Sequence, residues 1–234
     1  MQAFSQSFKI CFPLLLILMF SFSALAKLGS DEKKRVANSV EVIEQLISTP
    51  DKGVPDDIVN KCECAVIIPS VKKGAFIFGG QYGKGLATCR REGGGWTAPV
   101  FFSLQGGSVG LQIGGQSIDF VLLIMNSKGI NYLLDDKFTL GADASVAAGP
   151  VGRAASAETD AQLNAEILAY SRTQGVFAGI SLKGSVLKPD KNANRALYGQ
   201  DIKAKDILVD GKYDTPADTD PFIEAMKKIS PSKK

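Results

Sequence analysis

The sequence contains no histidine. This absence decides how the segment 106–110, GGSVG, is interpreted, because it fits the G-x-S-x-G pattern of hydrolase nucleophile elbows. A serine nucleophile in such an elbow needs a general base, which is almost always a histidine. The residues after Ser108 alternate and are rich in β-branched side chains, so they predict a strand where an elbow requires a helix. A Ser-His-Asp triad is therefore excluded.

Other catalytic patterns are incomplete. The stretch SVKK at 70–73 matches S-x-x-K, but the S-D-N and K-T-G motifs that accompany it in penicillin-interacting enzymes do not occur. The stretch GGQYGKG at 79–85 lacks the spacing and the Ser/Thr of a Walker loop. Asp135 and Asp136 are adjacent carboxylates, a pattern typical of a solvated helix end. We therefore expect no enzyme, no cofactor and no metal ion, and a hydrolase that acts without histidine is the alternative.

Charge of one sign is not in large excess. Lysine and arginine number 27 against 24 aspartate and glutamate, which gives a formal net charge of +3. This weak balance does not point to a nucleic-acid partner. Attraction to an anionic membrane would have to come from local clusters. Such clusters are Lys33-Lys34-Arg35, Lys72-Lys73 and Arg90-Arg91, with Lys84 between predicted strands.

Long hydrophobic runs are confined to the N-terminus. Residues 1–26 have the three parts of a secretory signal: the basic Lys9, the apolar run ICFPLLLILMFSFSAL, and the small-x-small site Ala24-Leu25-Ala26. The apolar run is short for a membrane span. We expect cleavage near Ala26 and export to the periplasm or medium, with an uncleaved anchor as the alternative. Residues 27–234 are then expected to form one domain.

Cysteine is scarce, and one of the four leaves with the predicted signal. Cys62, Cys64 and Cys89 remain, and an oxidising compartment favours one pair among them. Cys62 and Cys64 are too close in sequence to pair comfortably, so Cys89 is the expected partner of one of them. Cys64 is favoured because it and Cys89 both lie in strand-like runs. Metal binding by Cys62 and Cys64 is the alternative, although no histidine is present to complete such a site.

Helical periodicity begins at Ser30, in SDEKKRVANSVEVIEQLIS. Ser30 is a candidate cap, and one apolar stripe predicts an amphipathic helix that ends before Pro50. The stripe consists of Val36, Val40, Ile43 and Ile47. Shorter helices are expected in VPDDIVNKCE, SKGINYLLDDK and NANRALYG, and an amphipathic helix is expected in TPADTDPFIEAMKKIS near the C-terminus.

Between these helices the pattern is that of short strands, rich in Val, Ile, Phe and Thr and punctuated by glycine. The glycine pairs 79–80, 106–107 and 114–115 predict bends, and REGGGW predicts a hairpin turn. FTLGADASVAAGPVGR fits a strand or a tightly packed loop. We expect an α+β fold with a curved, largely antiparallel β-sheet, barrel- or sandwich-like, and flanking helices. The strand-like runs are CAVIIP, KGAFIFGGQYGKGLATCRR, GGWTAPVFFSLQGGSVGLQIGG, SIDFVLLIMN and AEILAYSRTQGVFAGISLKGSVLKPD.

Most of these runs, with FTLGADASVAAGPVGR and YSRTQGVFAGISLKGSVLKPDKNANRALYG, resemble the SYLF domain family, also called the actin-regulator family. The resemblance extends over residues 36–229 and implies a lipid-binding domain without catalytic residues. Eukaryotic members bind phosphoinositides, partly through a basic amphipathic segment at the N-terminus of the domain, and some bind and bundle actin. The helix with Lys33, Lys34 and Arg35 matches that segment in position.

The resemblance, with the signal, predicts an exported protein that binds anionic phospholipid at an envelope membrane surface. Basic side chains would bind the lipid, and the apolar face of the first helix would assist. Export argues against actin as a ligand, and the alternative function is an envelope protein-interaction module without a lipid. The candidate lipid-binding residues are Lys33, Lys34, Arg35, Lys72, Lys73, Lys84, Arg90 and Arg91.

Overall fold

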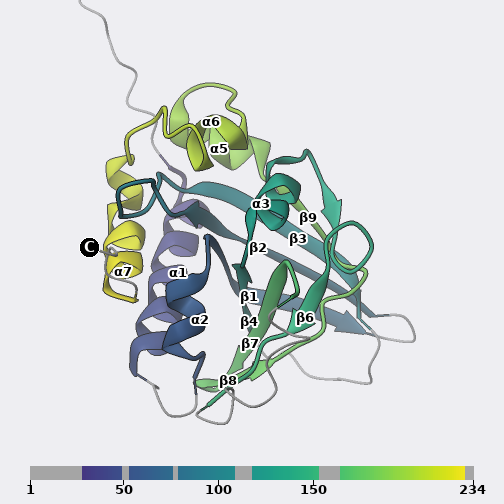
Figure 1. The fold of residues 1–234 in the computed structure, drawn as a ribbon. Helices are drawn as coiled ribbons and strands as arrows, with labels where there is room; N and C mark the ends of the chain where they lie inside the picture. The colour runs from purple at the N-terminus through teal and green to yellow at the C-terminus, as the bar shows by residue number, and fades with distance from the viewer. Residues whose placement is uncertain (1–27, 49–52, 76–78, 109–117, 153–163, 230–234) are drawn as a thin grey trace, which may run out of the picture.

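The computed structural model describes residues 28–48, 53–75, 79–108, 118–152 and 164–229. The predicted signal, its cleavage site near Ala26, and the glycine pair 114–115 lie outside these residues. The fold is a strongly curled nine-stranded sheet with helices packed against it (Figure 1). This confirms the predicted α+β class with a curved, largely antiparallel sheet.

The strand order in the sheet is β5-β9-β3-β2-β1-β4-β7-β6, and β8 pairs with β7 beside this path. Among the described strands, β6 and β7 form a parallel pair and the other pairs are antiparallel. The strands are β1 (Cys64–Ala75), β2 (Gly79–Cys89), β3 (Val100–Ser108), β4 (Ile118–Ile124), β5 (Phe138–Thr139), β6 (Val146–Ala148), β7 (Ile167–Thr173), β8 (Val176–Gly179) and β9 (Val186–Pro189).

The helices that the sequence predicts are present, and a further short helix at Ala204–Leu208 was not predicted. In Figure 1, α1 and α7 lie side by side along one face of the sheet, and α3 lies on the other face. None of the described helices has the length and apolar character needed to span a bilayer. The helices are α1 (Ser30–Ser48), α2 (Asp56–Lys61), α3 (Ser127–Leu134), α5 (Lys191–Tyr198), α6 (Ala204–Leu208) and α7 (Asp220–Ile229), with a 3₁₀ turn at Ala217–Thr219.

Both faces of the central strands are buried, in two separate hydrophobic cores. Along the first half of β1, Ala65 and Ile67 belong to the core under α1, α2 and α7. Val66 and Ile68 belong to the opposite core, which α3 and α6 cover. Because successive side chains of a strand point to opposite faces, a strand covered on both sides is apolar at every position. This is the reason that residues 64–68 of β1 and 120–124 of β4 read as unbroken apolar runs.

The apolar stripe of α1 packs into the first core. Val36 and Ile43 are buried there with residues of α7, and Val40 is partly buried. The side chain of Ile47 lies outside the described residues. The Lys33 N–H donates to the Gly29 carbonyl at 3.1 Å, so the helix is capped one residue before the predicted Ser30. The apolar face of α1 is therefore occupied by the domain itself and is not free to contact lipid.

One sequence-based prediction about β1 and β2, the disulfide, is confirmed. Cys64 and Cys89 lie opposite each other in the register and form a disulfide, with Cα atoms 3.9 Å apart. Cys62 keeps a buried free thiol that donates to the Val59 carbonyl at 3.1 Å. Gly85 lies so close to β1 that a Cβ there would meet the backbone of Ile67. Glycine in this strand thus permits the close backbone approach of a curled sheet.

Candidate functional site

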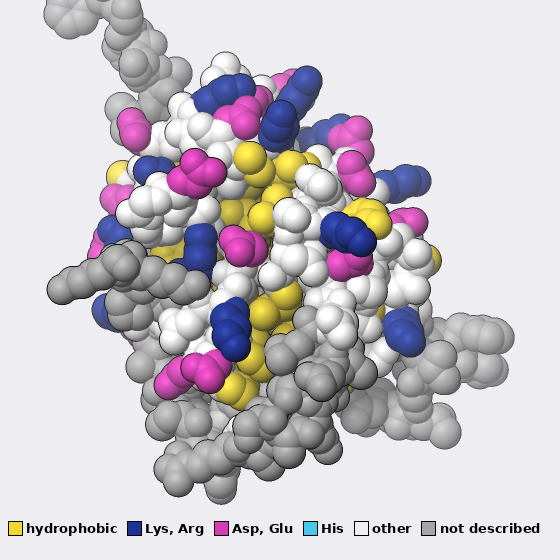
Figure 2. Space-filling view, viewed as in Figure 1, with side chains coloured by type: hydrophobic (Ala, Val, Ile, Leu, Met, Phe, Trp, Pro, Cys, Tyr) yellow, Lys and Arg dark blue, Asp and Glu magenta, His cyan; other side chains and the backbone are white. Residues whose placement is uncertain are grey.

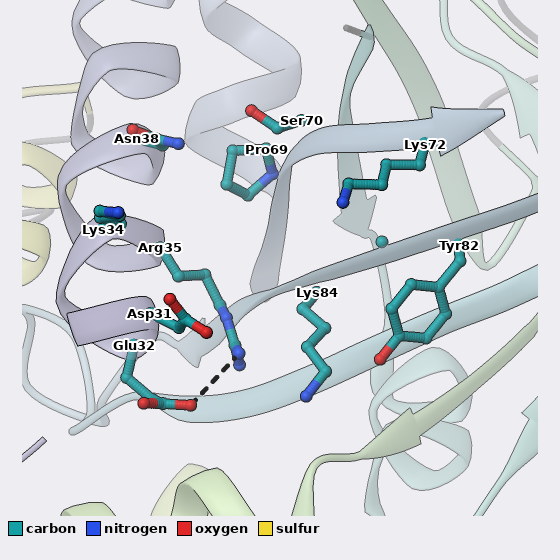
Figure 3. A pocket seen from close by; sticks show the side chains of 11 residues that line it. Asp31, Glu32, Lys34, Arg35, Asn38, Pro69, Ser70, Lys72, Tyr82 and Lys84 are labelled. Atoms are coloured by element: carbon teal, nitrogen blue, oxygen red, sulfur yellow. Dashed lines mark ion pairs between the residues drawn. The ribbon is translucent and has the colours of Figure 1, made fainter. Parts of the chain in front are cut away.

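A cavity of about 460 Å³ opens between α1 and the outer halves of β1 and β2 (Figure 3). Four cationic and two carboxylate side chains line it, together with a tyrosine, an amide and a hydroxyl. Among the described residues, no group of three or more Cys, Asp or Glu side chains could hold a metal ion. The lining residues are Asp31, Glu32, Lys34, Arg35, Asn38, Pro69, Ser70, Lys72, Tyr82, Gly83 and Lys84.

A β-bulge in β1 places Lys72 in this cavity. The pairing of β1 shifts register with both of its neighbours, between Ile67 and Lys72 on one side and between Ile68 and Val71 on the other. Before the bulge, the even-numbered residues of β1 face the core under α3 and α6. After the bulge, the odd-numbered Val71 faces that core instead. The extra residue therefore reverses the alternation, which turns Lys72 towards α1. Without the bulge, Lys72 would point into an apolar core.

Ser70 is the residue at which β1 bends. It has a φ of 52°, a left-handed conformation that a serine rarely adopts. Its N–H donates to Asp119 Oδ1 at 2.8 Å, and Asp119 is buried in the neighbouring strand β4. A strained backbone persists only where its surroundings fix it, and this hydrogen bond supplies that constraint.

The register between β1 and β2 brings the remaining side chains together. Lys72 pairs with Tyr82, and Lys84 lies two residues further along β2 on the same face. Figure 3 shows the Tyr82 and Lys84 side chains next to each other, with Lys72 above them and its end directed towards α1. The three polar groups thus come from two strands whose pairing determines their spacing.

Two of the cationic lining residues, Arg35 and Lys84, belong to an ion cluster around Asp190. The Asp190 carboxylate, just before α5, accepts from Lys84 Nζ at 2.8 Å and from an Arg35 nitrogen at 3.2 Å. Arg35 is only 8% exposed, also pairs with Glu32 at 3.5 Å, and lies 5.0 Å over the Phe101 ring. These contacts identify Arg35 as a structural residue that joins α1 to the sheet and to α5.

The cluster also sets the ionisation of its members. Burial alone would raise the pKa of Asp190, but the hydrogen bond and charge of Lys84, the Ala193 N–H and Arg35 together hold that pKa below its ordinary value. The hydrogen bond to Asp190 raises the pKa of Lys84. Both groups therefore stay charged at neutral pH, and the Asp190 carboxylate occupies the position where Arg35 and Lys84 converge.

Two lysines at the mouth of the cavity remain available to a ligand. Lys34 and Lys72 are exposed, and neither forms an ion pair or a side-chain hydrogen bond with any described residue. The Tyr82 side chain, at 42% exposure, is one of the few large exposed hydrophobic side chains. Exposed ammonium groups beside a hydroxyl suit an anionic oxygen ligand such as phosphate.

The structure separates the predicted lipid-binding residues into several locations. Lys34, Arg35, Lys72 and Lys84 meet at the cavity. Lys33 instead pairs with Asp218 at 3.3 Å, near the start of α7.

The other predicted residues lie away from the cavity. Lys73 points to the opposite face of the sheet, 5.8 Å over the Phe120 ring. Arg90 donates to the carbonyls of Cys62 and Val59 at 2.7 and 2.9 Å and covers Trp96. Arg91 is exposed at the glycine turn that follows β2.

Sequence reasoning missed Tyr82, Asn38 and Ser70 as lining residues. The alternation of Tyr82 and Lys84 in GGQYGKG is a signal that could have placed Tyr82 beside the lysine, because residues two apart in a strand share a face. On the face seen in Figure 2, Lys/Arg and Asp/Glu side chains of the described residues are interspersed. A field of one sign does not cover that face, so attraction to an anion depends on local groups such as Lys34 and Lys72.

Comparison with known proteins identifies the family to which the chain is similar. The profile of the family described as "Las17-binding protein actin regulator" (Ysc84) matches residues 105–229, a segment that begins in β3. The SH3 domain-containing protein PJ696.02 of Schizosaccharomyces pombe is 40% identical over 199 residues, which cover 83% of this chain and 43% of that protein.

Two further relatives give the same result. LAS seventeen-binding protein 3 of Saccharomyces cerevisiae is 33% identical over 180 residues, which cover 76% of this chain and 39% of that protein. The SH3 domain-containing YSC84-like protein 1 of Homo sapiens is 31% identical over 202 residues, which cover 85% of this chain and 58% of that protein. The chain thus spans 39% to 58% of the length of these relatives. By the family match and these similarities, the chain belongs to the Ysc84 family of Las17-binding, actin-regulator proteins.

Proposed function

We propose that the protein binds anionic phospholipid through the cavity between α1, β1 and β2, and that it acts as an exported protein at an envelope membrane surface. The observation that carries this proposal is the pair Lys34 and Lys72, two exposed lysines without an ion-pair partner among the described residues, next to Tyr82 and Lys84. A lipid phosphate can accept from both ammonium groups and from the tyrosine hydroxyl.

The expected strength is modest. Each lysine near an anionic surface contributes about 1 kcal/mol, which is roughly a fivefold change in affinity. Lys34 and Lys72 together therefore account for a factor of roughly 25. Such binding weakens as salt rises, because exposed charges are screened over about 10 Å at 0.1 M ionic strength.

Export rests on two features of the sequence and fold. Residues 1–26 have the pattern of a secretory signal, and the Cys64–Cys89 disulfide is typical of an oxidising compartment. The family description is that of a binding protein and regulator, and the chain has no histidine. We therefore propose a binding function without catalysis.

Vesicle sedimentation tests the proposal. The purified protein is mixed with phosphatidylcholine vesicles, with or without phosphatidylglycerol, at low and high salt. We expect sedimentation with the anionic vesicles at low salt and a loss of at least tenfold in affinity for the double variant Lys34→Ala/Lys72→Ala. Lys128→Ala is the matched control, because Lys128 is an exposed lysine on α3, outside the cavity. Equal binding by the double variant and the control would contradict the proposed site.

A protein partner is the second candidate function, because the family description and the name of the budding-yeast relative specify binding to another protein. The vesicle experiment separates the two. If the wild-type protein binds none of the vesicles at low salt, lipid binding fails and a protein ligand becomes the function to test. Binding to anionic vesicles that depends on Lys34 and Lys72 favours the lipid.

A further inference from the structure

A second cavity continues from the first along the polar face of α1. It has a volume of about 550 Å³ and shares Asn38 and Ser70 with the first cavity. The α1 residues Lys34, Asn38 and Glu41 follow one another at intervals of four and three, so they lie on one face of the helix. The two cavities thus form neighbouring compartments beside this face. The second is lined by Asn38, Glu41, Gln45, Ser70, Asp119, Arg172, Gln174 and Gly175.

The two compartments differ in charge. The first has two more cationic side chains than carboxylates, and the second has one more carboxylate than cations. Arg172 is engaged by Asp119, whose Oδ2 accepts from its Nε and from a terminal nitrogen, each at 2.6 Å. Its contact with Glu41 Oε1 is longer, at 3.4 Å. Arg172 therefore neutralises the charge of Asp119 more fully than that of Glu41.

Glu41 is available to a ligand. Its side chain is 62% exposed, and its described partners, Arg172 and Gln45, both contact Oε1. The second oxygen, Oε2, accepts no hydrogen bond from any described residue. The side-chain amide oxygens of Asn38 and Gln174 add further acceptors to the same lining. These groups match a ligand cation that donates several N–H bonds.

The lining of the second compartment is held in place by the backbone. Ser70 and Gln174 are the non-glycine residues with positive φ in the described part of the chain, at 52° and 50°, and both line this cavity. Gln174 lies in the tight turn between β7 and β8, and Ser70 is fixed by its bond to Asp119. Strained residues of this kind cluster at binding sites, because the surrounding structure fixes them in advance.

We infer that the bound head group is zwitterionic, with its phosphate in the first compartment and a primary ammonium in the second, as in phosphoethanolamine. This inference rests on the phosphate site of the proposed function and extends its ligand from anionic phospholipid to phosphatidylethanolamine, whose phosphate is anionic although the whole head group has no net charge. Glu41 would accept from the ammonium while Lys34 and Lys72 donate to the phosphate. A trimethylammonium group fits less well, because it has no N–H donors and no described residue that lines the second compartment is aromatic, as a cation–π contact would require.

Titration calorimetry with soluble head-group compounds tests the chemistry. O-phosphoethanolamine, phosphocholine and glycerol 3-phosphate all supply a phosphate, but only the first also supplies a primary ammonium. We expect phosphoethanolamine to bind roughly threefold more tightly than the other two, as an exposed ion pair allows. Glu41→Gln should remove this preference and leave the binding of glycerol 3-phosphate unchanged. Glu44→Gln is the matched control, because Glu44 is an exposed residue of α1 that lines neither cavity.

The outcomes separate this inference from the proposed function. If the three compounds bind equally, or Glu41→Gln retains the preference, the inference is overturned and the phosphate site stands. If none of the three binds, the inference is overturned, and the vesicle experiment alone decides the proposed function. Vesicles that contain phosphatidylglycerol with either phosphatidylethanolamine or phosphatidylcholine identify the source. A preference for phosphatidylethanolamine that Glu41→Gln abolishes supports the lipid, whereas a preference seen only with the soluble compounds overturns it in favour of a free phosphate ester.

Discussion

Replacing Arg35 by methionine should destabilise the protein, although a basic residue on an N-terminal helix invites a role in membrane binding. Methionine keeps much of the length of the side chain and removes the charge. Arg35 and Asp190 are 8% and 10% exposed, so the substitution leaves a largely buried carboxylate without one of its partners. Breaking a buried pair in this way costs about 3 to 5 kcal/mol.

The expected loss is smaller here, because Asp190 retains Lys84 at 2.8 Å and the Ala193 N–H. We take about 2 kcal/mol for the pair and add about 0.5 to 1 kcal/mol for the contact with the Phe101 ring. The total is about 2.5 to 3 kcal/mol, or a fall in melting temperature of about 5 to 12 °C for a domain of this size.

Urea unfolding, followed by circular dichroism under non-reducing conditions, measures this change. Lys34→Met is the matched control, because Lys34 is adjacent in sequence, exposed, and outside any described ion pair. Its unfolding free energy should stay within about 0.5 kcal/mol of wild type. If Arg35→Met and Lys34→Met have the same stability, the structural role assigned to Arg35 is wrong.

Three further predictions follow from single contacts. Burial would raise the pKa of Asp190, but Lys84, with the Ala193 N–H and Arg35, lowers it more, so the pKa of Asp190 is below its ordinary value in the folded protein. The ionised Asp190 carboxylate therefore stabilises the fold at neutral pH, and this stabilisation is lost as the pH falls through the lowered pKa. In urea unfolding, Asp190→Asn should therefore be less stable than wild type at pH 7, and its free energy of unfolding should fall less steeply below about pH 4. Parallel plots of the free energy of unfolding against pH for the two proteins would contradict this. Burial raises the pKa of the Cys62 thiol to about 11, so iodoacetamide at about pH 8 should alkylate Cys62 only in denaturant, as read by peptide mass spectrometry. Ready labelling of the native protein would show that the thiol is accessible. Gly85→Ala would press a Cβ against the β1 backbone and should lower the free energy of unfolding by about 1 to 3 kcal/mol in chemical denaturation. At Gly80 the nearest atom is 4.0 Å away, so Gly80→Ala should be tolerated. Equal effects of the two substitutions would refute the close approach of Gly85 to β1.

The helices other than α6, and the disulfide, could be predicted from the sequence because their signals are local. The Ser30–Ser48 helix follows from a periodic apolar stripe, and the Cys64–Cys89 pair follows from two cysteines in neighbouring strand-like runs. The course of β1 could not be predicted, because in the sequence its two halves resemble separate strand-like runs. The strand continues through the bulge at Ser70 because Asp119, 49 residues away, accepts the Ser70 N–H. A long-range hydrogen bond of this kind leaves no periodic trace in the sequence.

The sequence also does not show which charged side chains come together at the candidate site. Lys33, Lys34 and Arg35 are consecutive and look like one basic cluster, but successive residues of an α-helix point about 100° apart. Lys33 accordingly reaches Asp218 near α7, Lys34 lines the cavity, and Arg35 is buried against Asp190.

Lys72 and Lys84 show the converse, because they are distant in sequence and meet through strand pairing and a bulge.

Since the apolar face of α1 is also buried, the helix is not free to lie flat in a membrane. If the protein binds phospholipid, the geometry favours recognition of individual head groups at the edge of the helix. Binding should then depend on head-group chemistry more than on membrane curvature, which vesicles of one composition and different diameters would reveal.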